Sequence, residues 1–282
     1  MSRIAAERVD AHAHVFLLGA PLIEERRYTP AHDATEQDYL ESLLRNGINR
    51  GVLVQPSFLG TDNSLMLNTL RRYPGSLRGV AVVEPDVSRA TLEEMAHCGV
   101  VGIRLNLIGR PIPDFSEAVW KTLFATLAEL DWHIEIHSKA SELEAIVPPI
   151  LAAGVRVVAD HFGRPDPALG IDDPGFRYLL TLGRSGRVWV KLSGAYRNGP
   201  DGDAIAMQAV PLLKQAFGLK RLVWGSDWPH TQFENVITYE HTLQQLRQWL
   251  PDENDRLIVM RDSPSLLFGW QAGSTASGGT AS

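Results

Sequence analysis

The residues of this sequence best suited to proton transfer or metal binding lie near its two ends. His12 and His14 stand in the run Asp-Ala-His-Ala-His, which begins at Asp10, and Asp227 stands in the run Trp-Gly-Ser-Asp-Trp-Pro-His. Alternate residues of a β-strand point to the same side, so Asp10, His12 and His14 are predicted to share one face. Two imidazoles on one face indicate a metal site or a site that moves protons. The structural alternatives are a strand end with two solvated imidazoles and, for Asp227, a helix cap.

Eight short runs with the pattern of β-strands recur along the chain, with amphipathic segments between them. Apolar residues in those segments repeat every three to four positions, which is typical of helices that cover a core. A strand followed by a helix, repeated eight times, predicts an α/β fold in which a parallel sheet closes into a (β/α)8 TIM-like barrel. The alternative is a doubly wound open sheet. The predicted strands are 9–14, 51–55, 79–83, 102–106, 133–137, 155–161, 188–193 and 221–227.

Polar side chains stand where these predicted strands end. Barrel enzymes build their sites at the carboxyl ends of the strands, because the loops that follow the strands face one shared basin. A purely structural protein has no reason to line one rim with such groups, so the pattern indicates an enzyme. The polar residues at the strand ends are His14, Gln55, Ser57, Arg104, Asn106, His137, His161, Ser193 and Asp227.

One predicted strand also places a carboxylate inside the barrel. In the run 133–137, alternation sends His133, Glu135 and His137 to one side and two isoleucines to the other. The isoleucines are expected to face the helices, which leaves Glu135 inside. An unpaired internal carboxylate is very costly, and Lys191, inward by the same alternation, is the predicted partner. We expect this pair to be structural.

Four arginines lie at or after the predicted strand ends. The alternative for each one is an exposed side chain that is solvated or paired with an acid of a loop. Four that converge on one rim of an acidic protein indicate a substrate with two or more carboxylates, because a guanidinium can bind a carboxylate with two parallel hydrogen bonds. These residues are Arg104, Arg110, Arg164 and Arg197.

Composition narrows the class of protein and of partner. The 282 residues carry 27 Lys and Arg against 33 Asp and Glu, a formal charge of −6, and this acidic balance argues against a nucleic-acid surface. No apolar run is long enough to span a membrane, the N-terminus lacks the apolar core of a signal peptide, and Cys98 is the single cysteine, so we expect a cytoplasmic protein. The partner is expected to be a small molecule. We expect an extension at 1–8, one barrel domain at 9–270 and a flexible tail at 271–282.

The longer motifs together resemble those of the amidohydrolase superfamily, in particular amidohydrolase-related family 2 and its lactonase branch. They are Asp-Ala-His-Ala-His, Gln-Pro-Ser, Gly-Ile-Arg-Leu-Asn, Asp-His-Phe-Gly-Arg-Pro, Val-Lys-Leu-Ser-Gly-Ala-Tyr-Arg and Trp-Gly-Ser-Asp-Trp-Pro-His, and the resemblance covers nearly all of 9–270. It implies a (β/α)8 barrel that opens a carboxylated lactone, 2-pyrone-4,6-dicarboxylate or a close analogue, by attack of a water that Asp227 activates. The catalytic positions that it implies are His12, His14, His161 and Asp227. The positions that it implies for the two substrate carboxylates are Ser57, Arg104, Arg110, Arg164, Arg197 and Tyr28.

His137 departs from the pattern of this branch. Enzymes of the branch that act on 2-pyrone-4,6-dicarboxylate have a tyrosine at the end of the fifth strand and work without a metal, whereas metal-dependent superfamily members have a ligand histidine there. The resemblance therefore leaves two cofactor predictions: none, with His137 in contact with substrate, or one Zn²⁺ or Mn²⁺ held by His12, His14, His137 and Asp227. The alternative functions are a metal-dependent sugar lactonase, a superfamily decarboxylase, and a barrel without activity that binds a carboxylated metabolite.

Overall fold

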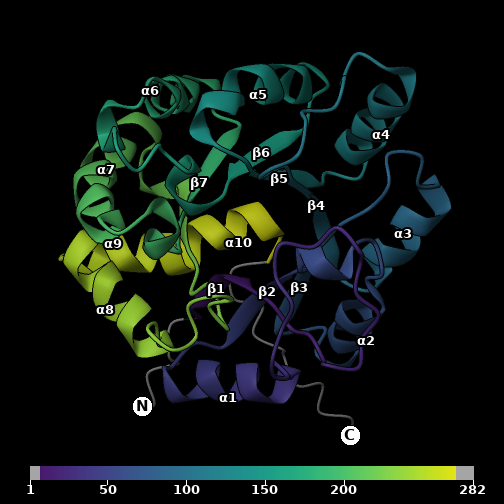
Figure 1. Ribbon diagram of the computed structural model, residues 1–282, viewed down its shortest axis with the longest axis horizontal. Coiled ribbons are helices and arrows are strands. Elements are labelled where there is room, and N and C mark those ends of the chain that lie inside the picture. The colour runs from purple at the N-terminus through teal and green to yellow at the C-terminus, as the bar shows by residue number, and fades with distance from the viewer. Residues whose placement is uncertain (1–6, 271–282) are drawn as a thin grey trace, which may run out of the picture.

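The computed structural model describes residues 7–270 of the chain. Its eight strands pair in chain order, all parallel, and form one sheet that curves into a barrel (Figure 1). The barrel closes where Ala13 bridges Trp228 and the N–H of Asp227 donates to the carbonyl of His12 at 2.8 Å. The predicted single-domain (β/α)8 barrel is confirmed. The strands are β1 (Val9–Ala13), β2 (Arg50–Val54), β3 (Leu77–Ala81), β4 (Val100–Asn106), β5 (His133–His137), β6 (Arg156–Ala159), β7 (Val188–Leu192) and β8 (Leu222–Trp224).

Helices surround the barrel in a ring that follows the order of the strands (Figure 1). Their apolar faces pack on the sheet, which is why the amphipathic segments fold as helices. The last helix crosses the amino end of the barrel, where Trp270 stacks under Arg50 and Arg78 at the starts of β2 and β3. The carboxyl end is therefore the open one. The helices are α1 (Glu36–Arg45), α2 (Ser64–Arg72), α3 (Arg89–His97), α4 (Ala118–Glu129), α5 (Leu143–Ala152), α6 (Pro174–Thr181), α7 (Gly202–Phe217), α8 (Tyr239–Trp249), α9 (Glu253–Leu257) and α10 (Ser263–Phe268).

The strands that lead to His161 and Asp227 are shorter than predicted. β6 ends at Ala159, two residues before its predicted end, and β8 ends at Trp224, three residues before its predicted end; every other predicted boundary lies within two residues of the observed one. His161 and Asp227 have φ angles of 50° and 61°, a left-handed backbone that cannot continue a strand and that residues other than glycine rarely adopt. Such strained positions concentrate at functional sites, where the surrounding structure holds them.

A bulge in β1 turns Asp10 away from the two histidines. Asp10 pairs with Gly51 and Ala13 pairs with Leu53, so β1 has one residue more between these pairs than β2 has. This extra residue reverses the alternation of the strand. Asp10 points outward, where the hydroxyl of Tyr239 in α8 donates to its carboxylate at 3.0 Å. The prediction that Asp10 shares a face with His12 and His14 was wrong, because alternation holds only for a regular strand.

The interior of the barrel holds the predicted ion pair. Nζ of Lys191 lies 2.6 Å from Oε1 of Glu135, and both side chains are fully buried. Nε2 of His133 lies 3.4 Å from the same oxygen. Ile134 and Ile136 belong to the core between the sheet and the helices. The alternation predicted for β5 is therefore confirmed.

The ends of the chain are described in part. Of the predicted extension, the structure describes Glu7 and Arg8, and the carbonyl of Arg8 accepts a hydrogen bond from the N–H of Arg50 at 3.1 Å. Residues 1–6 and the predicted tail at 271–282 lie outside the described residues. Within residues 7–270, no helix has the length and hydropathy needed to cross a membrane.

Candidate active site

A cavity of about 190 Å³ opens at the carboxyl ends of the strands. His12 is fully buried beside it, with its ring centroid 4.9 Å from that of His14. Arg110 is exposed and does not line the cavity. The other residues predicted for the site all line it: His14, Tyr28, Ser57, Arg104, His137, His161, Arg164, Arg197 and Asp227. The remaining lining residues are Arg27, Pro56, Phe58, Asn106, Thr231, Gln232 and Phe233.

The carboxylate of Asp227 has one oxygen held and one oxygen available. Oδ2 accepts hydrogen bonds from the hydroxyl of Tyr196 at 2.7 Å and from Nε of Arg197. Oδ1 is buried without a hydrogen-bond partner among the described residues, and it faces Nε2 of His14 at 3.6 Å and Nε2 of His12 at 3.7 Å. Burial raises the pKa of Asp227, but Arg197 and then the neighbouring histidines together outweigh burial and hold that pKa well below its usual value. Asp227 is therefore a carboxylate at neutral pH.

Hydrogen bonds assign the proton of His14. Its Nδ1 lies 2.7 Å from the carbonyl oxygen of Val54, and a carbonyl can only accept, so Nδ1 donates. In the neutral ring, Nε2 of His14 is then an acceptor, and it lies 3.2 Å from Nε2 of His12. On the other side of the His12 ring, Nδ1 lies 2.9 Å from Nζ of Lys191. The two histidines of β1 are thus linked to each other and to the interior of the barrel.

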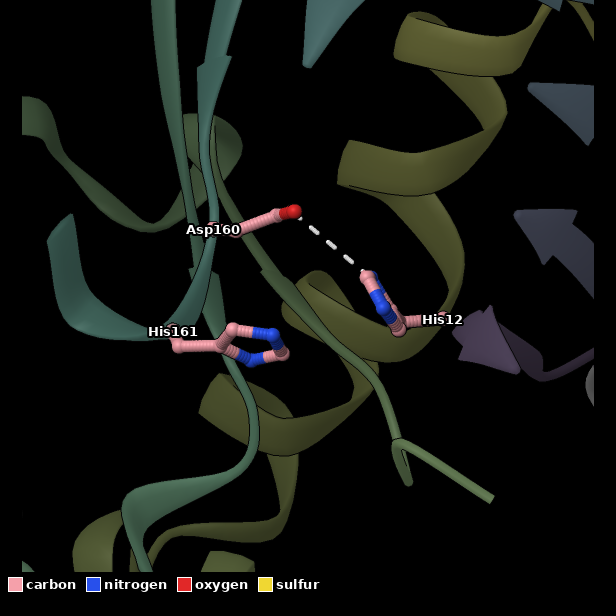
Figure 2. Close-up of side chains that lie close together, drawn as sticks. All are labelled: His12, Asp160 and His161. Carbon is pink, nitrogen blue, oxygen red and sulfur yellow. Dashed lines mark ion pairs between the residues drawn. The ribbon is translucent and has the colours of Figure 1, made fainter. Parts of the chain in front are cut away.

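Asp160 joins the interior ion pairs to the site. Its carboxylate lies 2.9 Å from Nη2 of Arg104, 3.4 Å from Nζ of Lys191 and 3.6 Å from Nδ1 of His12. Figure 2 shows this carboxylate pointing toward His12, with His161 next to it. Burial raises the pKa of Asp160, but Lys191 and Arg104 lower it well below its usual value. Asp160 is a fixed negative charge that the sequence analysis did not assign, although it directly precedes His161.

A glycine lets His161 and Asp227 approach each other. His161 begins a short turn after β6, and its Nδ1 lies 3.0 Å from Oγ of Ser193. Gly194 has a φ of 54°, and a Cβ there would lie 2.8 Å from Nδ1 of His161 and 2.9 Å from Oδ2 of Asp227. Burial, opposed by Asp227, lowers the pKa of His161 to about 3. The imidazole of His161 is therefore neutral at neutral pH.

The predicted substrate-binding arginines fall into two groups. Arg104 and Arg197 are already paired with acids, Asp160 and Asp227. Arg164 lines the cavity and has no acidic partner within residues 7–270. Burial and then Arg197 lower the pKa of Arg164 to about 10, so its guanidinium keeps its charge at neutral pH. Arg164 is the predicted arginine most available to an anionic ligand.

Arg27 is a cavity residue that the sequence analysis missed. It comes from the loop between β1 and α1, and its Nη2 donates to Oδ1 of Asn106 at 2.8 Å. Burial and then Arg104 lower its pKa, which reflects how closely the positive charges gather here. The sequence held one signal for Arg27, because it directly precedes Tyr28, a residue predicted to bind substrate. The hydroxyl of Tyr28 donates to Glu234. The cavity thus has a second guanidinium without an acidic partner in the described part of the chain.

Comparison with known proteins identifies the family. Residues 9–270 match the Amidohydrolase family. The chain belongs to the amidohydrolase family. This amidohydrolase is 32% identical over 269 residues to a 4-sulfomuconolactone hydrolase from Hydrogenophaga intermedia, a match that covers 92% of this chain and 88% of the relative. It is 33% identical over 247 residues to a 2-pyrone-4,6-dicarboxylate hydrolase from Comamonas testosteroni, covering 83% of this chain and 80% of the relative.

A solved structure has the same fold as this amidohydrolase. It is a probable 2-pyrone-4,6-dicarboxylic acid hydrolase from Acinetobacter baumannii with citric acid bound, 39% identical in sequence, with a TM-score of 0.91. The match covers 94% of this chain and 100% of that chain. These matches confirm the resemblance found in the motifs and the predicted enzyme class, a hydrolase that acts on a cyclic ester.

Three of the four predicted metal ligands of this amidohydrolase face one another. Nε2 of His12, Nε2 of His14 and Oδ1 of Asp227 are separated by 3.2, 3.6 and 3.7 Å. Ligands about 2.1 Å from a tetrahedral ion lie about 3.4 Å apart, so the spacing fits a metal ion. The tautomer of His12 does not fit a metal ion. Nζ of Lys191 donates to Nδ1 of His12, so the proton of the neutral ring lies on Nε2, the nitrogen that would have to bind the ion. In this arrangement the three groups do not match a cation.

His137, the fourth predicted ligand, has no hydrogen-bond partner for either ring nitrogen among residues 7–270. Its ring lies against that of His161, with the centroids 5.1 Å apart. Burial and then Arg104 lower its pKa well below the usual value, so the ring is neutral. His137 therefore brings an uncommitted N–H donor and an uncommitted acceptor to the cavity wall.

Proposed function

We propose that the protein hydrolyses a small cyclic ester that carries two or more carboxylates, and that 2-pyrone-4,6-dicarboxylate or a close analogue is its substrate. The observation that carries the proposal is Oδ1 of Asp227, an ionised and unpartnered oxygen among the described residues, in a cavity lined by arginines. A base in a cationic pocket suits an attack by water on an anionic substrate. The names of the relatives from Hydrogenophaga intermedia and Comamonas testosteroni, and the citric acid bound in the Acinetobacter baumannii structure, support it.

Asp227 is the proposed general base. A water against Oδ1 gives it a proton as the water oxygen bonds to the carbonyl carbon of the lactone. Negative charge then develops on the carbonyl oxygen, where N–H groups of the neutral His161 and His137 can donate to it. The ring C–O bond breaks, its electron pair stays on the ring oxygen, and that oxygen takes the proton from Asp227. The new carboxylic acid ionises at neutral pH.

The leaving group decides how much help the ring oxygen needs. Opening a pyrone releases a resonance-stabilised enolate, which needs little protonation, whereas opening a sugar lactone releases an alkoxide, which needs an acid or a Lewis acid. Burial lowers the pKa of His161 to about 3 and lowers that of His137 well below its usual value, so neither ring carries the second proton that a general acid would need at neutral pH. These groups favour the pyrone class over the sugar lactones.

The arginines are proposed to bind the substrate carboxylates. Arg27 and Arg164 line the cavity without an acidic partner in the described chain, so each can bind a carboxylate with two parallel hydrogen bonds. Arg104 and Arg197 remain proposed contacts through the N–H groups that their acids leave unused. Arg110, exposed at the rim, is proposed to attract the anion as it enters. Further proposed contacts are Ser57, Tyr28 and His137.

A pH-stat assay on chelator-treated protein tests this function. Each ester opened yields one carboxylic acid, so base uptake reports the reaction directly. We expect acid release from 2-pyrone-4,6-dicarboxylate and little from a panel of aldonolactones. Acid release from aldonolactones alone, and only with added Zn²⁺ or Mn²⁺, would favour the sugar lactonase. Release of CO₂ without ring opening would favour the decarboxylase, and tight binding without turnover would favour the binding barrel.

A further inference from the structure

Lys191 is fully buried beneath the cavity, yet it touches one of the histidines of the site. Its Nζ lies 2.6 Å from Oε1 of Glu135, 2.9 Å from Nδ1 of His12 and 3.4 Å from Oδ1 of Asp160. A lysine ammonium has three N–H groups and no lone pair, so it can only donate. The contact with Nδ1 of His12 has the geometry of a hydrogen bond, and those with Glu135 and Asp160 are ion pairs. A donor on Nζ requires Nδ1 of His12 to offer a lone pair.

This contact decides where the proton of His12 lies. An imidazole always carries at least one N–H, so a lone pair on Nδ1 leaves the proton on Nε2. The competing arrangement would have Nδ1 donate to Oδ1 of Asp160, which lies 3.6 Å away on the line drawn in Figure 2. That separation is longer than a hydrogen bond, and the arrangement would set two donors, Nδ1 and Nζ of Lys191, 2.9 Å apart.

We propose that Lys191 is a positioning residue that keeps the His12 proton on Nε2 and so makes His12, His14 and Asp227 a seat for the attacking water. Nε2 of His12 donates, whereas Nε2 of His14 and Oδ1 of Asp227 accept. The N–H of His12 and the lone pair of His14 face each other at 3.2 Å, and a water placed over the three atoms takes the place of that contact. Such a water accepts one hydrogen bond and donates two, which is the complement of this set. The water can lie about 2.8 Å from each atom, on the side where His14 and Asp227 border the cavity.

The opposite tautomer would make a different site. With the proton on Nδ1, the three facing atoms would all be acceptors, and three acceptors without a donor suit a cation. Lys191 therefore selects a water over a metal ion without touching either one. The reaction of that water rests on the proposed function, but the tautomer of His12 can be measured in the protein alone.

The first test is ¹⁵N NMR of the wild-type protein labelled at histidine, with the His12 signals assigned by their loss in His12→Gln. We expect a pyrrole-like shift for Nε2 of His12 and a pyridine-like shift for Nδ1. The reverse pair of shifts would overturn the proposal. This measurement needs no substrate and no variant of Lys191.

The second test compares two variants. Lys191→Met combined with Glu135→Gln removes the ammonium together with the carboxylate it neutralises, and Glu135→Gln alone is the matched control that keeps the ammonium. We expect the double variant to move the His12 proton to Nδ1, to bind Zn²⁺ at least about 10-fold more tightly than wild type in calorimetry, and to lose about 10-fold or more in kcat with little change in KM. The control should keep the wild-type shifts.

The outcomes separate this inference from the proposed function. A His12 that keeps its Nε2 proton in the double variant, or equal Zn²⁺ affinity in all three proteins, would show that Lys191 does not set the tautomer. If the double variant does not fold, the wild-type shifts decide the question. If the shifts agree with expectation but wild-type protein opens no lactone, the proposed function fails and the role of Lys191 stands.

Discussion

Oδ1 of Asp227 lies 3.6 Å from Nε2 of His14, and the two residues come from opposite ends of the chain. They meet where the barrel closes, because the bridge between Ala13 and Trp228 joins the segment after β8 to the end of β1. Tyr196 and Arg197 hold Oδ2 of Asp227, which leaves Oδ1 for the water. One backbone closure thus brings together the residues of the proposed acid–base centre, and each of them can be replaced separately.

Arg164→Met should raise KM for a dicarboxylate lactone by about 10-fold to 100-fold, because it removes a charge-assisted pair of hydrogen bonds to the substrate. Arg110→Met should raise it less, since Arg110 is exposed at the rim. Both changes should matter less for a neutral lactone, and Arg71→Met, on the exposed face of α2, is the control. Equal effects on charged and neutral substrates would contradict the assignment of the arginines.

The pH dependence of kcat/KM should be flat from about pH 5 to about pH 8. Burial raises the pKa of Asp227, but Arg197 and the neighbouring histidines together hold it well below its usual value, so the proposed base stays deprotonated in this window. The pKa values of His161, about 3, and of His230, about 4, keep both rings neutral there. Activity should fall only as the pH drops into the acid range. An acid limb centred near the ordinary histidine value would mean that a histidine, and not Asp227, is the base.

Tyr196→Phe should cut kcat by about 10-fold, because it removes one of the two donors that fix Asp227. It should also move the acid limb of kcat/KM upward, since a hydrogen bond to the ionised form lowers the pKa of a carboxyl. Tyr73→Phe, a tyrosine at the end of α2, is the matched control. An unmoved acid limb in Tyr196→Phe would show that its hydroxyl does not support the carboxylate.

Removal of metals should leave activity unchanged. The proton on Nε2 of His12 does not fit a bound ion, so the chelator-treated protein should keep its kcat for a dicarboxylate pyrone. Metal content before and after treatment is measured by elemental analysis, and kcat by the pH-stat assay. Loss of activity that Zn²⁺ or Mn²⁺ restores would support the metal set of His12, His14, His137 and Asp227.

The general position of the site could be predicted from sequence because barrel geometry is regular. Polar residues at strand ends must gather at one rim, which brought His14, His137, His161 and Asp227 to one cavity. The same regularity identified Lys191 as the partner of the carboxylate inside the barrel. These predictions depend only on strand order and alternation.

The rest depends on irregular backbone and on the direction of single side chains. The bulge in β1 reversed the prediction for Asp10, and alternation carries no sign of such a bulge. Arg110 and Arg27 both lie in loops, and only the folded loops make the first exposed and the second part of the cavity wall. Tyr196 and Asp160 stood beside assigned residues, but their hydrogen bonds and ion pairs cross between strands that the sequence does not align.

The most direct test of the account is the turnover of 2-pyrone-4,6-dicarboxylate by Asp227→Asn, measured by acid release beside the wild-type protein. The amide keeps the size of the side chain but cannot accept the proton of the water, so kcat should fall by about 100-fold or more while KM changes little. Thermal unfolding of both proteins checks that the fold is intact. Near-normal turnover by a folded Asp227→Asn would show that another group activates the water.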